Sequence, residues 1–226
     1  MVIAPDKITW INQLILLTAG FFLLCSFGLI AAAQVVGCLR IYVMQSLLLA
    51  VSAILLGIGY HSTDLWIVAA IAIAAKVILI PFLLRRTARH DMIARRELQQ
   101  AINVPMSLLI ALALTVLAYY IVDPMMDHTS RSIHANLPIG FAAVLIAIYT
   151  ITVRREALPQ MLSLLAIENG AFFAGIAVAP NFPLIGELAA SFDVLMVVLT
   201  LGVLSTQIHR LSGSTEVGTL SELRED

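Results

Sequence analysis

The chain has 226 residues and a net charge of −1, with 61% hydrophobic and only 12% charged residues. An ordinary globular domain has about 25% charged residues, so a soluble protein of this length could not bury so much apolar surface. The near-neutral charge excludes a nucleic-acid-binding protein. The two cysteines, Cys25 and Cys38, are too few for an iron–sulfur site or a four-cysteine zinc site. The composition indicates an integral membrane protein that has no cofactor or metal of its own.

Seven stretches are long and apolar enough for transmembrane helices, which need about 20 residues to cross the hydrocarbon core. The sequence therefore predicts an all-α membrane protein with seven transmembrane helices. The predicted spans are 11–37, 41–60, 65–84, 103–122, 137–153, 157–178 and 184–208.

The positive charges predict the orientation. Of the 13 Lys and Arg residues, ten lie in the joints after spans one, three, five and seven. Two others, Lys7 and Arg131, lie on the opposite side, and Lys76 lies inside a span. Because positive loops stay in the cytoplasm, we expect the N-terminus outside and the C-terminus in the cytoplasm. The ten residues are Arg40, Arg85, Arg86, Arg89, Arg95, Arg96, Arg154, Arg155, Arg210 and Arg224.

The first and last three spans resemble each other. Gln45 matches Gln160 at an offset of 115 residues, and an offset of 117 places Lys76 opposite Asp193. Since span four reverses the direction of the chain, the pattern predicts a parallel 3+1+3 repeat, a construction known from transporters. The expected parts are a first repeat (1–84), a basic cytoplasmic loop with the connecting helix and an outer loop (85–136), a second repeat (137–210) and a cytoplasmic tail (211–226).

Four ionisable residues fall inside the predicted spans. Lys76, Glu168 and Asp193 lie near the middle of theirs, and Glu187 lies one turn inside the outer surface. A charge at the bilayer centre costs about 2.5–3.5 kcal/mol, so we expect these groups to pair or to face protein or water. Lys76 can pair with Glu168 or with Asp193. Each carboxyl group either handles protons or only aids assembly, and Glu187 is alternatively an interfacial carboxylate.

Supporting polar groups lie in the same spans. Gln45, Gln160 and Asn169 are expected to form hydrogen bonds across helix interfaces or to hold water. Pro81 lacks the amide that would bind the Val77 carbonyl, so the sequence predicts a free acceptor next to Lys76.

Four short motifs follow one another along the chain: Tyr42…Gln45-Ser46-Leu47, Ala75-Lys76-Val77-Ile78-Leu79-Ile80-Pro81, Ile167-Glu168-Asn169-Gly170 and Ile185-Gly186-Glu187…Asp193. This pattern resembles the hydrogenase-4 component E family over the whole chain. The last three spans also resemble the K (4L) subunit of respiratory complex I. Arg154 and Arg155 correspond to its Arg pair, and Glu168 and Asp193 to its two buried glutamates, with Asp in place of the second Glu.

The resemblance implies a non-catalytic subunit in the membrane arm of a complex-I-like redox complex, in a bacterial or archaeal cytoplasmic (inner) membrane. Glu168, Asp193, Lys76 and Glu187 would then take part in proton or ion translocation coupled to electron transfer. Antiporter-like membrane subunits and a membrane-anchored hydrogenase or similar redox arm would be its partners, and lipid would surround it. The NiFe centre and iron–sulfur clusters would belong to those partners.

Three other functions are compatible with a seven-helix chain. A secondary transporter of a small solute can have the 3+1+3 plan, but its prolines tend to match between the triplets, and Pro81 and Pro159 do not correspond. A seven-helix receptor or retinal protein would also have its N-terminus outside, but a retinal-binding lysine is expected in the last span, whereas Lys76 lies in the third. A structural anchor would have buried charges that are paired and inactive.

Overall fold

The computed structural model describes residues 5–87, 102–125, 131–155 and 157–178, and this part of the chain is helical apart from short connections. Its elements are α1 (Pro5–Ala31), α2 (Val35–Tyr60), α3 (Thr63–Ala72), the π-helix η1 (Ile73–Leu79), α4 (Ile80–Thr87), α6 (Val104–Val122), the short 3-10 helix η2 (Asp123–Met125), α7 (Arg131–Val153) and α8 (Ala157–Val178).

Five helices of the described part are long and apolar enough to cross a membrane: α1, α2, the continuous α3–η1–α4 helix, α6 and α7. The chain is therefore a multi-pass membrane protein by length and composition. Helix α8 has the bounds predicted for the sixth span and carries three polar residues, Gln160, Glu168 and Asn169. The seventh predicted span, 184–208, and the tail, 211–226, lie outside the described residues. The orientation and the parallel repeat stay predictions.

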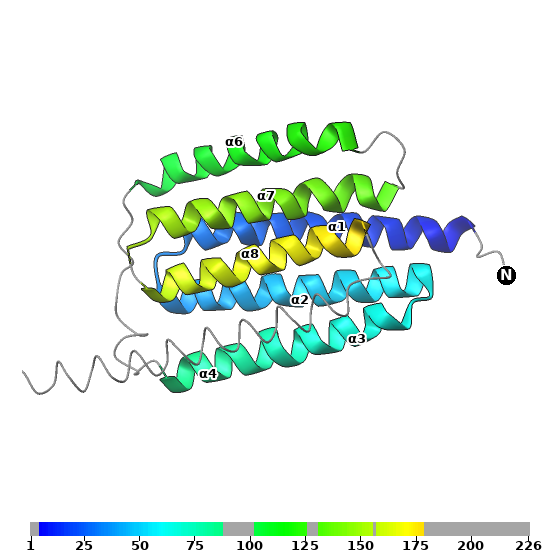
Figure 1. The fold of residues 1–226 in the computed structure, drawn as a ribbon, viewed down its shortest axis with the longest axis horizontal. Coiled ribbons are helices and arrows are strands. Elements are labelled where there is room, and N and C mark those ends of the chain that lie inside the picture. Colours follow the sequence, from blue (N-terminus) through cyan, green and yellow to red (C-terminus); the bar gives the residue numbers. More distant parts are fainter. Residues whose placement is uncertain (1–4, 88–101, 126–130, 156, 179–226) are drawn as a thin grey trace, which may run out of the picture.

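The helices run side by side as a bundle (Figure 1). Helices α1, α2, α8 and α7 form a closed central group in which each contacts the next and α7 contacts α1. Helix α6 covers α7 at one edge, and the α3–η1–α4 helix covers α2 at the opposite edge. We call the end where α1 and α7 begin the amino end, and the end where Arg154 lies the arginine end.

One predicted helix boundary is wrong. The first joint lies at residues 32–34 rather than 38–40, so Arg40 is in the second turn of α2 and not in a loop. The reason is a contact from far along the chain: the Arg154 guanidinium binds the carbonyls of Leu29 and Ala32 and so ends α1. The predicted fifth span, 137–153, agrees with the observed apolar span Asn136–Val153, and helix α7 itself begins earlier, at Arg131, with Pro138 accommodated inside it.

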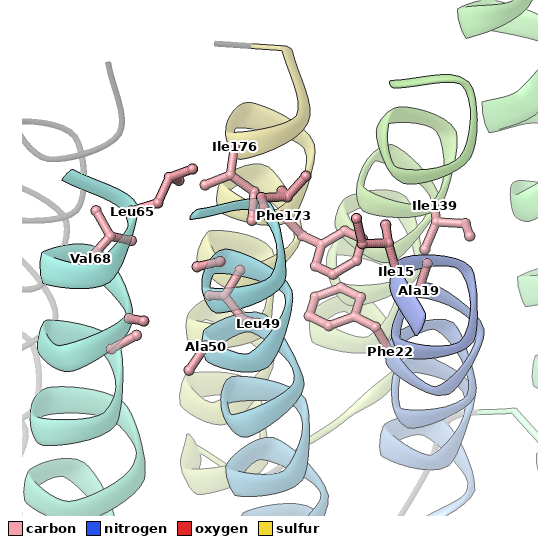
Figure 2. Close-up of a cluster of buried hydrophobic side chains, with 14 of the residues drawn as sticks. Ile15, Ala19, Phe22, Leu49, Ala50, Leu65, Val68, Ile139, Phe173 and Ile176 are labelled. Carbon is pink, nitrogen blue, oxygen red and sulfur yellow. The ribbon is translucent and has the colours of Figure 1, made fainter. Parts of the chain in front are cut away.

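Buried apolar side chains form two main clusters at different heights of the bundle. The amino-end cluster, part of which is drawn in Figure 2, contains the stacked rings of Phe22 and Phe173, whose centroids are 4.2 Å apart. The arginine-end cluster is built around Tyr42 and Leu162. Its other members are Leu29, Cys38, Leu39, Ile80, Ala147, Met161, Leu165 and Ala166.

Helices α7 and α8 approach closely through two glycines. A Cβ added to Gly140 would lie 2.7 Å from the Gly170 carbonyl oxygen, and one added to Gly170 would lie 2.9 Å from the Val144 amide nitrogen. These distances leave no room for a side chain at either position. The two glycines fix the position of α8 beside α7, and with it the position of Glu168 and Asn169.

Candidate functional site

A layer of polar side chains separates the two apolar clusters. On every helix that contributes to it, the polar residue falls between members of the amino-end cluster and members of the arginine-end cluster. On α8, for example, Glu168 and Asn169 lie between Ala166 and Phe173. We call this set the polar layer; its members are Ser26, Gln45, Ser46, Lys76, Glu168 and Asn169.

An ion pair lies at one side of the layer. The Nζ of Lys76 is 2.8 Å from Oε1 of Glu168, and the Lys76 side chain is fully buried whereas 16% of the Glu168 side chain is exposed. The ammonium group also lies 5.2 Å from the centroid of the Phe172 ring, a cation–π distance. Of the two partners that the sequence left open for Lys76, the described part of the chain supplies Glu168.

Both charges lie far from the ends of their helices. Lys76 is 13 residues from the start of the α3–η1–α4 helix at Thr63, and Glu168 is 11 residues from the start of α8 at Ala157. At 1.5 Å per residue, these positions are roughly 15–20 Å from the helix ends and therefore near the centre of a 30 Å hydrocarbon layer. The pair thus places one positive and one negative charge near the middle of the membrane.

The backbone that holds Lys76 is a π-helix. The Ile73 amide donates to the Ala69 carbonyl, four residues back, whereas the Ile80 amide donates to the Ala75 carbonyl, five residues back. The helix is therefore widened by one residue around Lys76. Short π-helical segments are rare and frequently occur at functional sites. Pro81 follows directly, and the sequence predicted a missing amide bond there but not the wider turn.

Two hydrogen bonds extend the layer from the ion pair across the bundle. Nδ2 of Asn169 on α8 donates to the Ser46 hydroxyl on α2, at 2.9 Å. Nε2 of Gln45, the neighbour of Ser46, donates to the Ser26 hydroxyl on α1, at 3.0 Å. The expected cross-helix bonds of Gln45 and Asn169 are thus confirmed, and the layer reaches from η1 through α8 and α2 to α1.

Gln160, the third predicted supporting residue, is not part of the polar layer. Nε2 of Gln160 donates to the Arg154 carbonyl at 2.7 Å, so this glutamine joins the start of α8 to the preceding connection. Glu187 and Asp193 lie outside the described residues, and their roles stay predictions.

The polar contacts of three residues were not predicted from the sequence. Ser26 and Ser46 accept the bonds from Gln45 and Asn169, but serine is too common in membrane helices to attract notice. Arg154 was expected to mark the cytoplasmic side and to correspond to an Arg pair of the K (4L) subunit, but its contacts were not predicted: 2% of it is exposed, and its guanidinium binds three carbonyls at the end of α1. Its pairing with α1, 122 to 125 residues away, is invisible to local patterns.

The arrangement suits proton or charge relay rather than bond chemistry. A buried lysine and carboxylate in direct contact can exchange or share a proton, and neighbouring amide and hydroxyl groups can follow with their hydrogen bonds. Among the described residues no group of three or more His, Cys, Asp or Glu side chains could hold a metal ion.

The chain has relatives along nearly its whole length. It is 31% identical to the uncharacterized protein Rv0085 of Mycobacterium tuberculosis over 207 residues, which cover 92% of this chain and 94% of that protein. It is 25% identical to hydrogenase-4 component E of Escherichia coli K12 over 207 residues, which cover 91% of this chain and 95% of that protein. No protein-family model matches the chain, and no solved structure matches it. The chain therefore belongs to one protein family with Rv0085, and its full-length similarity extends, at lower identity, to hydrogenase-4 component E.

Proposed function

We propose that the chain is a non-catalytic membrane subunit of a hydrogenase-4-type, complex-I-like redox complex and that its polar layer takes part in proton translocation. The full-length similarity to a hydrogenase-4 component supports membership of such a complex. The observation that carries the proposed role is the ion pair of Lys76 and Glu168 near the centre of apolar helices.

Proton movement through such a pair follows from its electrostatics. When a proton arrives on Glu168, the carboxylate becomes a neutral acid and the Lys76 ammonium loses its counter-charge. In an apolar layer this state is costly, so Lys76 either releases its proton or turns toward another carboxylate. Either response changes the charge that a neighbouring subunit experiences. Asp193 and Glu187 are the further carboxyl groups that we propose for this relay.

The remaining parts of the proposal concern the partners. The NiFe centre and iron–sulfur clusters would lie in a hydrogenase-type arm on the cytoplasmic side, and antiporter-like subunits would flank this chain within a bacterial or archaeal cytoplasmic membrane. This chain would supply ionisable groups and no redox centre.

Co-purification tests the assignment to a complex. The full chain is tagged at its own locus, the membrane is extracted in mild detergent, and the bound proteins are identified by mass spectrometry. We expect antiporter-like membrane subunits together with a hydrogenase-type or iron–sulfur arm. A chain that purifies alone, as a monomer or homo-oligomer, would contradict the proposal and favour a stand-alone transporter.

The proton role needs a separate test, because a subunit with an inactive ion pair would also co-purify. Glu168→Gln retains the size and hydrogen-bonding capacity of the side chain but cannot be ionised. In inverted vesicles we expect this variant to assemble and to transfer electrons while the coupled proton movement falls. Unchanged proton movement at a normal level of complex would show that the pair is only structural.

A further inference from the structure

Some buried polar atoms at the amino end have no hydrogen-bond partner. Asn136 on α7 and Ser52 on α2 are both 0% exposed. Neither the amide nitrogen nor the amide oxygen of Asn136 has a partner in the described part of the chain, and the same is true of the Ser52 hydroxyl. Both residues lie among the amino-end cluster: Asn136 is one turn from Ile139, and Ser52 is one turn from Leu49 and Leu56.

A third residue with such an atom lies in the polar layer itself. Asn169 donates to Ser46 through its nitrogen, whereas its Oδ1, also buried, has no partner among the described residues. Asn169 is one turn from Phe173, whose ring belongs to the amino-end cluster. The unpartnered atoms therefore occur in the amino half of the bundle and at its boundary with the polar layer.

In the part of the chain that the structure describes, the buried polar side chains of the arginine half have partners. The Ser163 hydroxyl, 0% exposed, donates to the Pro159 carbonyl at 2.8 Å, and the Thr150 hydroxyl donates to the Ile146 carbonyl at 2.7 Å. Tyr42 and Arg154 also have partners. The two halves of the bundle thus differ in how well their buried polar atoms are satisfied.

Leaving an amide without a hydrogen bond in an apolar environment is unfavourable, which is why nearly all buried polar groups in native proteins have a protein or water partner. The Asn136 side chain is enclosed by this chain, so a side chain of another subunit could reach it only if the helices separated. A water molecule needs no such movement, and buried waters commonly bind groups that are otherwise unsatisfied.

We infer that water enters the bundle from the amino end, binds at Asn136 and Ser52, and reaches the polar layer at Asn169. The stacked rings of Phe22 and Phe173 lie one turn from Ser26 and Asn169 on the amino side, so this water passes beside the stack. The arginine-end cluster keeps the opposite half dry. The ion pair of Lys76 and Glu168 therefore exchanges protons with the side of the membrane at which α1 begins.

The meaning for proton transfer rests on the proposed function, but the presence of water can be measured without it. Ser52 and Ser163 form a matched pair for the measurement, since both are serines in helices and both are 0% exposed. Each is replaced by cysteine in a full-length chain that carries Cys25→Ala and Cys38→Ala. Membranes from cells that express the chain with its natural partners are treated with silver ions, a small thiol-reactive cation that travels through water. The protein is then unfolded, and the remaining free thiols are labelled with a maleimide of high mass.

We expect silver to abolish maleimide labelling of Ser52→Cys and to leave labelling of Ser163→Cys intact. Adding Asn136→Leu should restore the labelling of Ser52→Cys, because it removes the polar atoms that hold the water. Silver reaction at both cysteines would overturn the inference that the arginine half is dry. Reaction at neither would overturn the inference that water enters at all.

A second pair guards against misfolding of either serine variant. Ala143 of the amino-end cluster and Ala147 of the arginine-end cluster lie one turn apart on α7 and are both buried. Silver should react with Ala143→Cys and not with Ala147→Cys, and the reverse order would overturn the inference. The result does not depend on proton transport, so a wet amino half with unchanged proton movement in Glu168→Gln would refute the proposed function alone.

Discussion

Gly140 on α7 and Gly170 on α8 face each other so closely that a Cβ on either residue would meet the backbone of the opposite helix. Gly170 follows Glu168 by two positions and Asn169 by one, so this contact fixes the height and the rotation at which α8 presents its two polar groups. Close backbone packing beside Glu168 thus determines where the ion pair forms.

Adding a methyl group at this contact should therefore destabilise the bundle. We expect Gly170→Ala to cost about 1–3 kcal/mol, because an overpacked interface must shift either a side chain or the backbone. Gly175→Ala is the matched control on the same helix, since a Cβ there would have no neighbour within 4 Å. Thermal aggregation in detergent, followed by fluorescence-detected size exclusion, measures both variants. Equal midpoints for the two would refute the role of the close approach.

The ion pair predicts that substitutions of Lys76 and Glu168 have non-additive effects on stability. Replacing only one partner, as in Lys76→Met or Glu168→Leu, leaves an opposite charge buried, which typically costs about 3–5 kcal/mol. The double variant Lys76→Met/Glu168→Leu removes both charges, so we expect its stability to return close to that of the unaltered chain. Thermal melts of the unaltered chain, the two single variants and the double variant give the coupling free energy between the two side chains. A double variant that is less stable than both single variants would show that the two side chains do not act as a pair.

Arg154 and Arg155 are adjacent but should respond differently to substitution. Arg154 is buried and donates to the carbonyls of Leu29, Ile30 and Ala32, whereas Arg155 is exposed. Arg154→Gln cannot span the three acceptors, and we expect a loss of about 1–3 kcal/mol for the polar groups left unsatisfied. Arg155→Gln should leave the melting temperature unchanged. The comparison is decisive because both changes remove one positive charge from the same connection.

The bond between Asn169 and Ser46 should be weak. Hydrogen bonds between membrane helices contribute on average about 0.6 kcal/mol in double-mutant cycles, with a maximum near 1.7 kcal/mol. We expect the cycle of Asn169→Ala and Ser46→Ala to give a coupling within this range. A small coupling is what a relay requires, since the amide must be able to rotate when a neighbouring group changes charge. A coupling several times larger would instead indicate a rigid structural bond.

The sequence predicts the helices well because each is specified by its own apolar run. The bounds of α8 and the position of the connecting helix α6 follow from such runs, and the mid-membrane placement of Lys76 and Glu168 follows from counting along them. Choosing between Glu168 and Asp193 as the partner of Lys76 was not possible, because the choice depends on which helices are neighbours. The partner in the described part of the chain is Glu168.

Features that depend on distant contacts escaped prediction. The end of α1 is decided by the guanidinium of Arg154 and not by residues near Ala31. The hydroxyls of Ser26 and Ser46 gain importance only from the amides opposite them. Periodicity within one helix carries no information about such pairings.

The π-helix has one more consequence. It contains one residue more per turn than an α-helix needs, so all residues after it are rotated by about 100° relative to the residues before it. The α3–η1–α4 helix thus has two half-helices, one on each side of the wide turn. Across this turn Ala72, Lys76 and Ile80 are all buried, and Ala72 belongs to the amino-end cluster whereas Ile80 belongs to the arginine-end cluster. Deleting a single residue between Ala72 and Ile80 should turn the second half-helix away from its cluster. A relative that lacks one residue there would keep the bundle only if it carried a different apolar pattern in α4, and an alignment that ignores the wide turn would pair the wrong residues with Lys76.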